Sequence, residues 1–235
     1  MITSSDEDYK DTKLIKQGKK KLETSFKEFA KWINEKFEVN VLNIYYDAIQ
    51  HENRPRLNVI FEFSKDEKKF RTGFYGMYDE EKQQILAGKF KLLLETKRLN
   101  KKELFLKIFS NKPVLKYDTK NIFVIFSSFE PIARSEANSC IPQEKIQELK
   151  MKIGNKDLWE ISRCFSSTTF FFYTDNQVKE NSCNGMLEKL TEEYYKLLKV
   201  YDEFDYIKRE SYSICIDSKE NFDKNYASNW YYYYK

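Results

Sequence analysis

The chain has 235 residues, of which 41% are hydrophobic and 17% aromatic, and this apolar content excludes an intrinsically disordered protein. The 41 basic and 37 acidic residues give a net charge of +4, so the composition predicts a packed core beneath a heavily charged surface. Residues 1–8 are polar and acidic, and no apolar run reaches the roughly 18 residues of a membrane span. We therefore expect a cytoplasmic protein without membrane contact.

The first half of the chain predicts a helix, a strand hairpin, a second helix and a third strand. Apolar residues at three- and four-residue steps indicate an amphipathic helix over 13–37. β-Branched and aromatic residues indicate a strand over 39–46, and two-residue alternation indicates its partner over 57–63. The elements expected next are a helix over 79–98, a shorter helical piece over 101–109 and a buried strand over 122–126.

The same order of elements recurs in the second half. The expected elements are a helix over 143–153, extended stretches over 158–165 and 168–173, a helix over 184–204, a strand over 212–216 and a closing strand over 230–234. We therefore predict an α+β protein with a mixed or antiparallel sheet and packed helices. It would form two similar helix–strand–strand–helix–strand lobes, 1–130 and 131–235; a single domain over 10–235 is the alternative.

No residue pattern indicates catalysis or a cofactor. The one histidine, His51, lies in a predicted turn without an identifiable titrating partner. The four cysteines are Cys140, Cys164, Cys183 and Cys215, and their spacing fits neither a zinc site nor a redox pair. We interpret them as reduced thiols that mostly fill the core, and we expect no catalytic residue, no metal, no cofactor and no enzyme activity.

Basic residues are concentrated in the middle of the chain. Residues 82–120 include eleven Lys or Arg and three Asp or Glu, a local excess of 11 − 3 = +8. Aliphatic and aromatic residues alternate with them as in a buried helix stripe, and no nucleic-acid-binding signature is present, so we expect no nucleic-acid partner. The candidate contacts for an acidic protein partner are Lys97, Arg98, Lys101 and Lys102.

The C-terminal tail holds one tryptophan followed by four tyrosines, Trp230 to Tyr234. In the predicted strand, Tyr231 and Tyr233 would face one way while the other three rings face the opposite way. Because Tyr and Trp dominate the energetic centres of protein interfaces, Tyr231 and Tyr233 are candidate partner-binding residues.

The segment 187–235 combines a long helix, an alternating strand at 212–216, an acidic-aromatic stretch at 218–223 and an aromatic terminus. This layout resembles the C-terminal end of bacterial polymorphic-toxin immunity proteins of the YezG-like type. The resemblance implies a non-enzymatic antitoxin that binds a cognate secreted toxin and blocks it by steric occlusion. The alternative is a nucleic-acid-binding protein, or an enzyme whose carboxylate or lysine site is not visible in the sequence.

Overall fold

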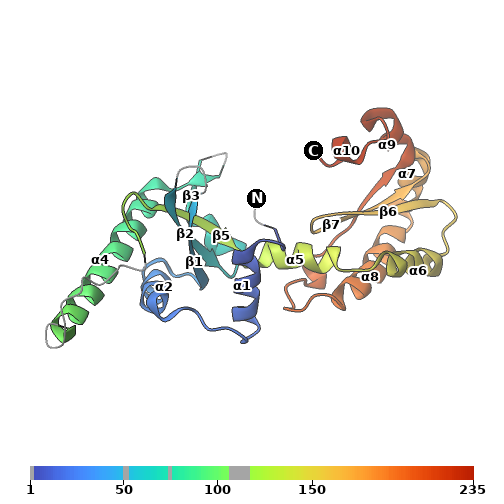
Figure 1. The fold of residues 1–235 in the computed structure, drawn as a ribbon. Coiled ribbons are helices and arrows are strands. Elements are labelled where there is room, and N and C mark those ends of the chain that lie inside the picture. Colours follow the sequence, from blue (N-terminus) through green and yellow to red (C-terminus); the bar gives the residue numbers. More distant parts are fainter. Residues whose placement is uncertain (1–2, 50–52, 74–75, 106–116) are drawn as a thin grey trace. The chain divides into compact units, whose positions relative to one another are not determined.

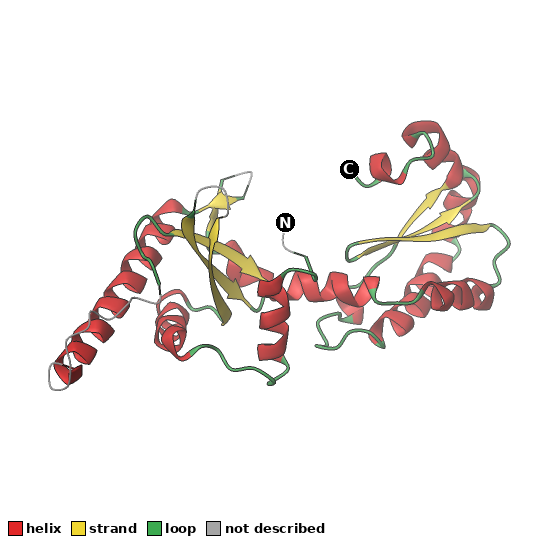
Figure 2. Ribbon diagram, in the orientation of Figure 1, coloured by secondary structure: helices red, strands yellow, loops and turns green. Residues whose placement is uncertain are grey.

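A computed structural model describes residues 3–49, 53–73, 76–105 and 117–235, with the backbone alone described over 97–105. The described residues form helices and small sheets, which confirms the predicted α+β class (Figures 1 and 2). The chain divides into two compact units, Met1–Glu130 and Pro131–Lys235. No helix in the described part of the chain combines the length and the apolar character that a membrane crossing needs.

The first unit is a three-stranded sheet with helices on both faces. Its elements are α1 (Glu7–Lys16), α2 (Thr24–Phe37), β1 (Val41–Ile49), β2 (Arg54–Phe61), α3 (Ser64–Lys68), β3 (Arg71–Thr72), β4 (Met77–Tyr78), α4 (Glu80–Phe105) and β5 (Phe123–Ser128). The strand order is β1-β2-β5, with β1 antiparallel and β5 parallel to β2. The helix predicted over 13–37 is two helices, because Gly18 takes a left-handed conformation that ends the first of them.

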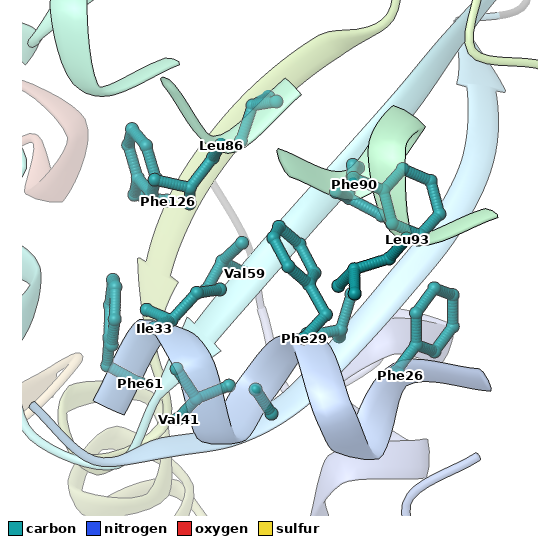
Figure 3. Packing of buried hydrophobic residues seen from close by; sticks show 14 of the residues in the cluster. Phe26, Phe29, Ile33, Val41, Val59, Phe61, Leu86, Phe90, Leu93 and Phe126 are labelled. Atoms are coloured by element: carbon teal, nitrogen blue, oxygen red, sulfur yellow. The ribbon is translucent and has the colours of Figure 1, made fainter. Parts of the chain in front are cut away.

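Helices α2 and α4 bury the inner face of this sheet. The apolar stripe of α2 places Phe26, Phe29 and Ile33 against the strands, and Phe90 of α4 completes the packing (Figure 3). Phe29 and Ile33 are fully buried. Their recurrence at three- and four-residue steps is the sequence signal that predicted this helix face.

Helix α1 covers the outer face of the same sheet with a polar contact layer. The Asn43 amide donates a hydrogen bond to Thr12 Oγ1 (2.9 Å), and the Asn58 amide donates to Asp8 Oδ2 (2.9 Å). Tyr9 stacks on Phe129 with ring centroids 5.0 Å apart. Burial raises the pKa of Asp8.

The second unit repeats this arrangement. Its elements are α5 (Phe129–Ser139, which begins in the last two residues of the first unit), α6 (Gln143–Ile153), β6 (Leu158–Cys164), β7 (Ser167–Phe172), α7 (Asp175–Cys183), α8 (Met186–Lys199), a 3₁₀ turn (Arg209–Ser211), β8 (Cys215–Ser218), α9 (Lys219–Tyr226) and α10 (Trp230–Tyr233). The strand order is β6-β7-β8, with β6 antiparallel and β8 parallel to β7. Figure 1 shows α6 and α8 on one side of this sheet and α9 and α10 on the other.

The two sheets also share details of strand register. A bulge interrupts the first strand at the same place in each, between Val41 and Asn43 in β1 and between Leu158 and Glu160 in β6. A glutamate that follows the third strand makes the same contact in each unit. Glu130 accepts a hydrogen bond from the backbone N–H of Ser64 (3.2 Å), and Glu220 accepts one from Asp175 (3.1 Å).

The four cysteines do not fill the core, and that prediction is wrong. Cys140, Cys183 and Cys215 are exposed and Cys164 is half-buried. Side chains alternate between the two faces of the sheet along residues 214–216. Ile214 and Ile216 pack in the core with α6 and α8, so Cys215 points toward the opposite face.

A buried polar network ties α5 to the hairpin of the second unit. The Asn138 side chain is 1% exposed. Its amide nitrogen donates to the carbonyl oxygens of Phe165 (2.8 Å) and Ser167 (3.1 Å), and its oxygen accepts from the Tyr194 hydroxyl (2.6 Å). One asparagine therefore satisfies the backbone of the β6–β7 turn and a phenol of α8.

We predict that Asn138→Ala lowers the free energy of unfolding by about 3 kcal/mol, because the buried hydroxyls of Tyr194 and Thr168 both lose the Asn138 oxygen as a partner, at about 1–3 kcal/mol each. Urea unfolding followed by circular dichroism measures the change. The matched control is Ser139→Ala, since the exposed Ser139 hydroxyl donates to the Glu136 carbonyl oxygen within its own helix, and its effect should stay within about 0.5 kcal/mol. Equal effects of the two substitutions would contradict the role of the network.

Candidate functional site

The C-terminal tail is a short helix rather than the predicted closing strand. Ala227 and Ser228 both have left-handed backbone (φ 52° and 54°), which turns the chain back after α9. The Asn229 side chain then accepts a hydrogen bond from the Tyr231 N–H (2.9 Å) and so begins α10. These local interactions stabilise the helix, whereas a run of five consecutive aromatic residues has no apolar–polar period that favours either a helix or a strand.

The helix separates the two tyrosines that a strand would place together. Tyr231 is 68% exposed and its neighbour Tyr232 is 55% exposed. Tyr233 instead turns toward the sheet, where its hydroxyl donates a hydrogen bond to Asp217 Oδ2 (2.6 Å). Burial and the adjacent Asp217 carboxylate both raise the pKa of Tyr233.

Six rings form an aromatic layer on the outer face of the β6-β7-β8 sheet. We call this set the outer aromatic layer; it comprises Trp159, Phe171, Phe222, Trp230, Tyr233 and Tyr234. Trp230 is central to it, with its ring centroid 4.2 Å from that of Phe222, 5.3 Å from that of Phe171 and 6.1 Å from that of Trp159. The indoles of Trp159 and Trp230 are parallel within 8°. Trp230 nevertheless stays 37% exposed, so the layer continues to the molecular surface.

A groove of about 340 Å³ runs beside this layer along the edge strand β6. Its lining residues are Gln143, Trp159, Glu160, Ile161, Ser162, Arg163 and Trp230. Five of the seven are consecutive residues of one strand, because the groove follows the side of β6 that has no neighbouring strand in the sheet. Trp230 borders it on the outer face and Gln143, at the start of α6, on the inner face.

The hairpin geometry shows which backbone groups point into this groove. Only Phe165 and Ser166 join β6 to β7, so the pair Cys164 and Ser167 closes a two-residue turn with hydrogen bonds. Hydrogen-bonded and non-hydrogen-bonded pairs alternate along an antiparallel ladder. The backbone N–H and C=O groups of Arg163 therefore point away from β7, toward the open side.

The same alternation turns the Ile161 backbone outward, and its N–H donates to the side chain of Glu160 (3.2 Å). Within the described part of the chain, Glu160 makes no ion pair. The Arg163 guanidinium is held by the carbonyl oxygens of Asn138 and Ile141, each at 2.8 Å. The groove thus offers the outward backbone groups of Arg163, a carboxylate that has no ion pair among the described residues, and a fixed guanidinium; the Lys150 ammonium binds the Trp159 carbonyl oxygen at the other end of the strand.

The first unit has a groove of about 440 Å³ at the equivalent position along β1. The Ile44 N–H there donates to the Asn43 side chain (2.8 Å), as Ile161 does to Glu160. The amide and the carboxylates of this groove already have partners, because Asn43 also bonds Thr12, Asp11 pairs with Lys20 (2.6 Å) and Glu23 accepts from the Tyr117 hydroxyl. The β6 groove is therefore the better candidate for a binding site.

The remaining predicted residues lie where side chains are not described. Lys97, Arg98, Lys101 and Lys102 belong to α4, whose side chains from residue 97 onward are outside the described part of the structure. His51 also lies outside the described residues. Among the residues that are described, no group of three His, Cys, Asp or Glu side chains could hold a metal ion.

Sequence reasoning identified the aromatic tail but not the groove beside it. Neither Trp159 nor Glu160 stands out in the sequence, because the groove arises from the position of β6 at a sheet edge and from its bulge. No protein-family model, curated protein or solved structure matches the chain.

We predict that Tyr233→Phe lowers the free energy of unfolding at pH 7 by about 1.5 kcal/mol, the scale of a hydrogen bond to a charged acceptor. The raised pKa of Tyr233 means that the folded protein binds the phenol proton more tightly than the unfolded chain. Its contribution is complete below pH 10 and falls as the pH rises above that value. The variant should therefore lose stability less steeply than the wild type between pH 9 and pH 11, in urea unfolding followed by fluorescence.

Tyr231→Phe is the matched control, since its hydroxyl lies on an exposed ring of the same helix. It should change neither the stability at pH 7 nor the alkaline slope. An identical pH dependence in Tyr233→Phe and the wild type would show that the Asp217 contact does not stabilise the fold.

Proposed function

We propose that this protein is a non-enzymatic binding protein that acts by covering a partner protein. The observation that carries the proposal is the presentation of Trp230, Tyr231 and Tyr232 as consecutive exposed aromatic residues on a supported helix. Monomeric surfaces seldom expose adjacent large aromatic rings without a partner. Trp and Tyr are also the residues enriched at the energetic centres of interfaces.

The packing beneath α10 favours tight binding. Trp230 is held against Phe222, and Tyr233 is fixed by its hydrogen bond to Asp217, so the helix is ordered before any partner arrives. Binding then costs little additional conformational entropy for the groups at the interface. A rigid aromatic helix therefore supports stoichiometric, high-affinity association better than transient contact.

The proposed partner is a cognate secreted toxin, which this protein would neutralise by steric occlusion in the cytoplasm. The support is the resemblance of the 187–235 segment to the C-terminal end of YezG-like immunity proteins, together with the exposed aromatic helix within that segment. The test begins with capture of stoichiometric partners by the tagged full-length protein from its native cells. We expect to capture a protein that arrests growth when it is expressed alone. Co-expression with this chain should restore growth. A captured partner without toxicity would overturn the antitoxin role.

We predict that the double substitution Tyr231→Ala and Tyr232→Ala weakens partner binding at least 30-fold, which corresponds to the roughly 2 kcal/mol of an interface hot spot. Both rings are exposed, so the folded protein should keep its unfolding midpoint. Isothermal titration calorimetry with the captured partner measures the affinity.

The matched control is Met151→Ala with Val200→Ala, a pair of apolar side chains that are 72% and 78% exposed in the same unit. This control should retain wild-type affinity. Equal affinities for the aromatic double variant and the wild type would place the interface away from α10.

A further inference from the structure

We infer that the β6 groove accepts an extended peptide segment as a fourth strand, with a basic side chain of that segment facing Glu160. The inference rests on the proposed binding function and specifies the partner: it presents an exposed strand or an extended terminus that carries Lys or Arg. Such strand addition supplies affinity through main-chain hydrogen bonds and specificity through alternate side chains.

The backbone of β6 is suited to this addition. The strand spans seven residues, Leu158–Cys164, at the edge of its sheet. The outward N–H and C=O of Arg163 have no hydrogen-bond partner within the described part of the chain. Edge strands of native proteins are normally covered or blunted, so an edge that lies open in a groove is a template for pairing.

The edge is also protected against indiscriminate pairing. The Glu160 side chain accepts the Ile161 N–H, which occupies one of the outward donors (3.2 Å). The bulge between Leu158 and Glu160 bends the strand and ends the regular ladder there. An incoming strand must therefore offer something that engages the Glu160 carboxylate, and this requirement selects among strands.

A cation is the group that satisfies Glu160. The carboxylate lies in a groove whose lining includes the indoles of Trp159 and Trp230, and aromatic faces attract cations. The layer already holds one cation in this way, because the Lys219 ammonium lies 5.3 Å from the Trp159 ring centroid. An acidic residue of the incoming strand would place two carboxylates together without a compensating cation, so acidic strands are disfavoured.

The test uses a phage-displayed library of random dodecapeptides, selected on the immobilised full-length protein. We expect the recovered peptides to share one Lys or Arg position within an alternating pattern of β-branched or aromatic residues. A synthetic peptide with the consensus sequence should slow amide exchange of Arg163 at least tenfold in NMR-detected hydrogen exchange. The amide of Tyr46, at the equivalent outward position of β1, should be unchanged.

Glu160→Gln tests the charge while keeping an oxygen that can accept the Ile161 N–H. We expect this substitution to weaken binding of the consensus peptide about tenfold, as measured by calorimetry. The control Glu180→Gln removes an exposed carboxylate of α7 in the same unit and should leave the affinity unchanged. A consensus without a basic residue, an unprotected Arg163 amide, or an unaltered affinity in Glu160→Gln would each overturn the inference.

The outcomes separate this inference from the proposed function. If a toxin partner binds through Tyr231 and Tyr232 while no selected peptide protects Arg163, strand addition is refuted and the binding function stands. If peptides add to β6 but the cells yield no stoichiometric partner, the antitoxin role is refuted and strand addition at the β6 groove is still supported. Concentration-dependent self-association that protects Arg163 without peptide would identify a second copy as the occupant and overturn the peptide inference.

Discussion

Each unit of this protein depends on the burial of both faces of a three-stranded sheet. A sheet this small is stable only when other elements cover its apolar side chains. In both units the inner face is covered by two helices, one that precedes the hairpin and one that precedes the third strand. The outer faces differ: hydrogen bonds of Asn43 and Asn58 to α1 serve the first, whereas the packing of Trp230 and its neighbouring rings serves the second.

The aromatic solution in the second unit links stability to recognition. The ring of Trp230 packs on Phe222 and Phe171 while more than a third of its surface remains exposed, so one side chain belongs both to the fold and to the surface. In the same helix, Tyr233 is held against the sheet by its hydrogen bond to Asp217, whereas Tyr231 is exposed at the surface. A polar outer layer, as in the first unit, could bury its sheet equally well but would present no comparable apolar anchor.

The elements with a complete helical period were predictable from the sequence. The helix over 143–153 has the bounds expected of it, because Ile146 and Leu149 face the core and Gly154 ends the helix in a left-handed conformation. The strand predicted for the tail was wrong for a physical reason. Five consecutive aromatic residues show neither the helical nor the strand period of apolar residues, and the hydrogen bond at the Asn229 cap determines the helix. The prediction of one continuous helix over 13–37 was wrong because Gly18 ends the first helix. The regular apolar stripe across this region gave more weight to a single helix than one glycine gave to a break.

The candidate groove could not be predicted from sequence periods. Which strand lies at the edge of a sheet depends on how the strands pair, and the sequence of a single strand does not show this. The two units show how little is needed to change such an edge. At one position of a shared register, Asn43 bonds Thr12 and lies buried, whereas Glu160 is half-buried and makes no ion pair in the described part of the chain. The backbone, the bulge and the bond to the next N–H are common to both. The chemistry of the β6 edge therefore comes from one side chain and the indoles beside it, on a scaffold that the fold builds twice.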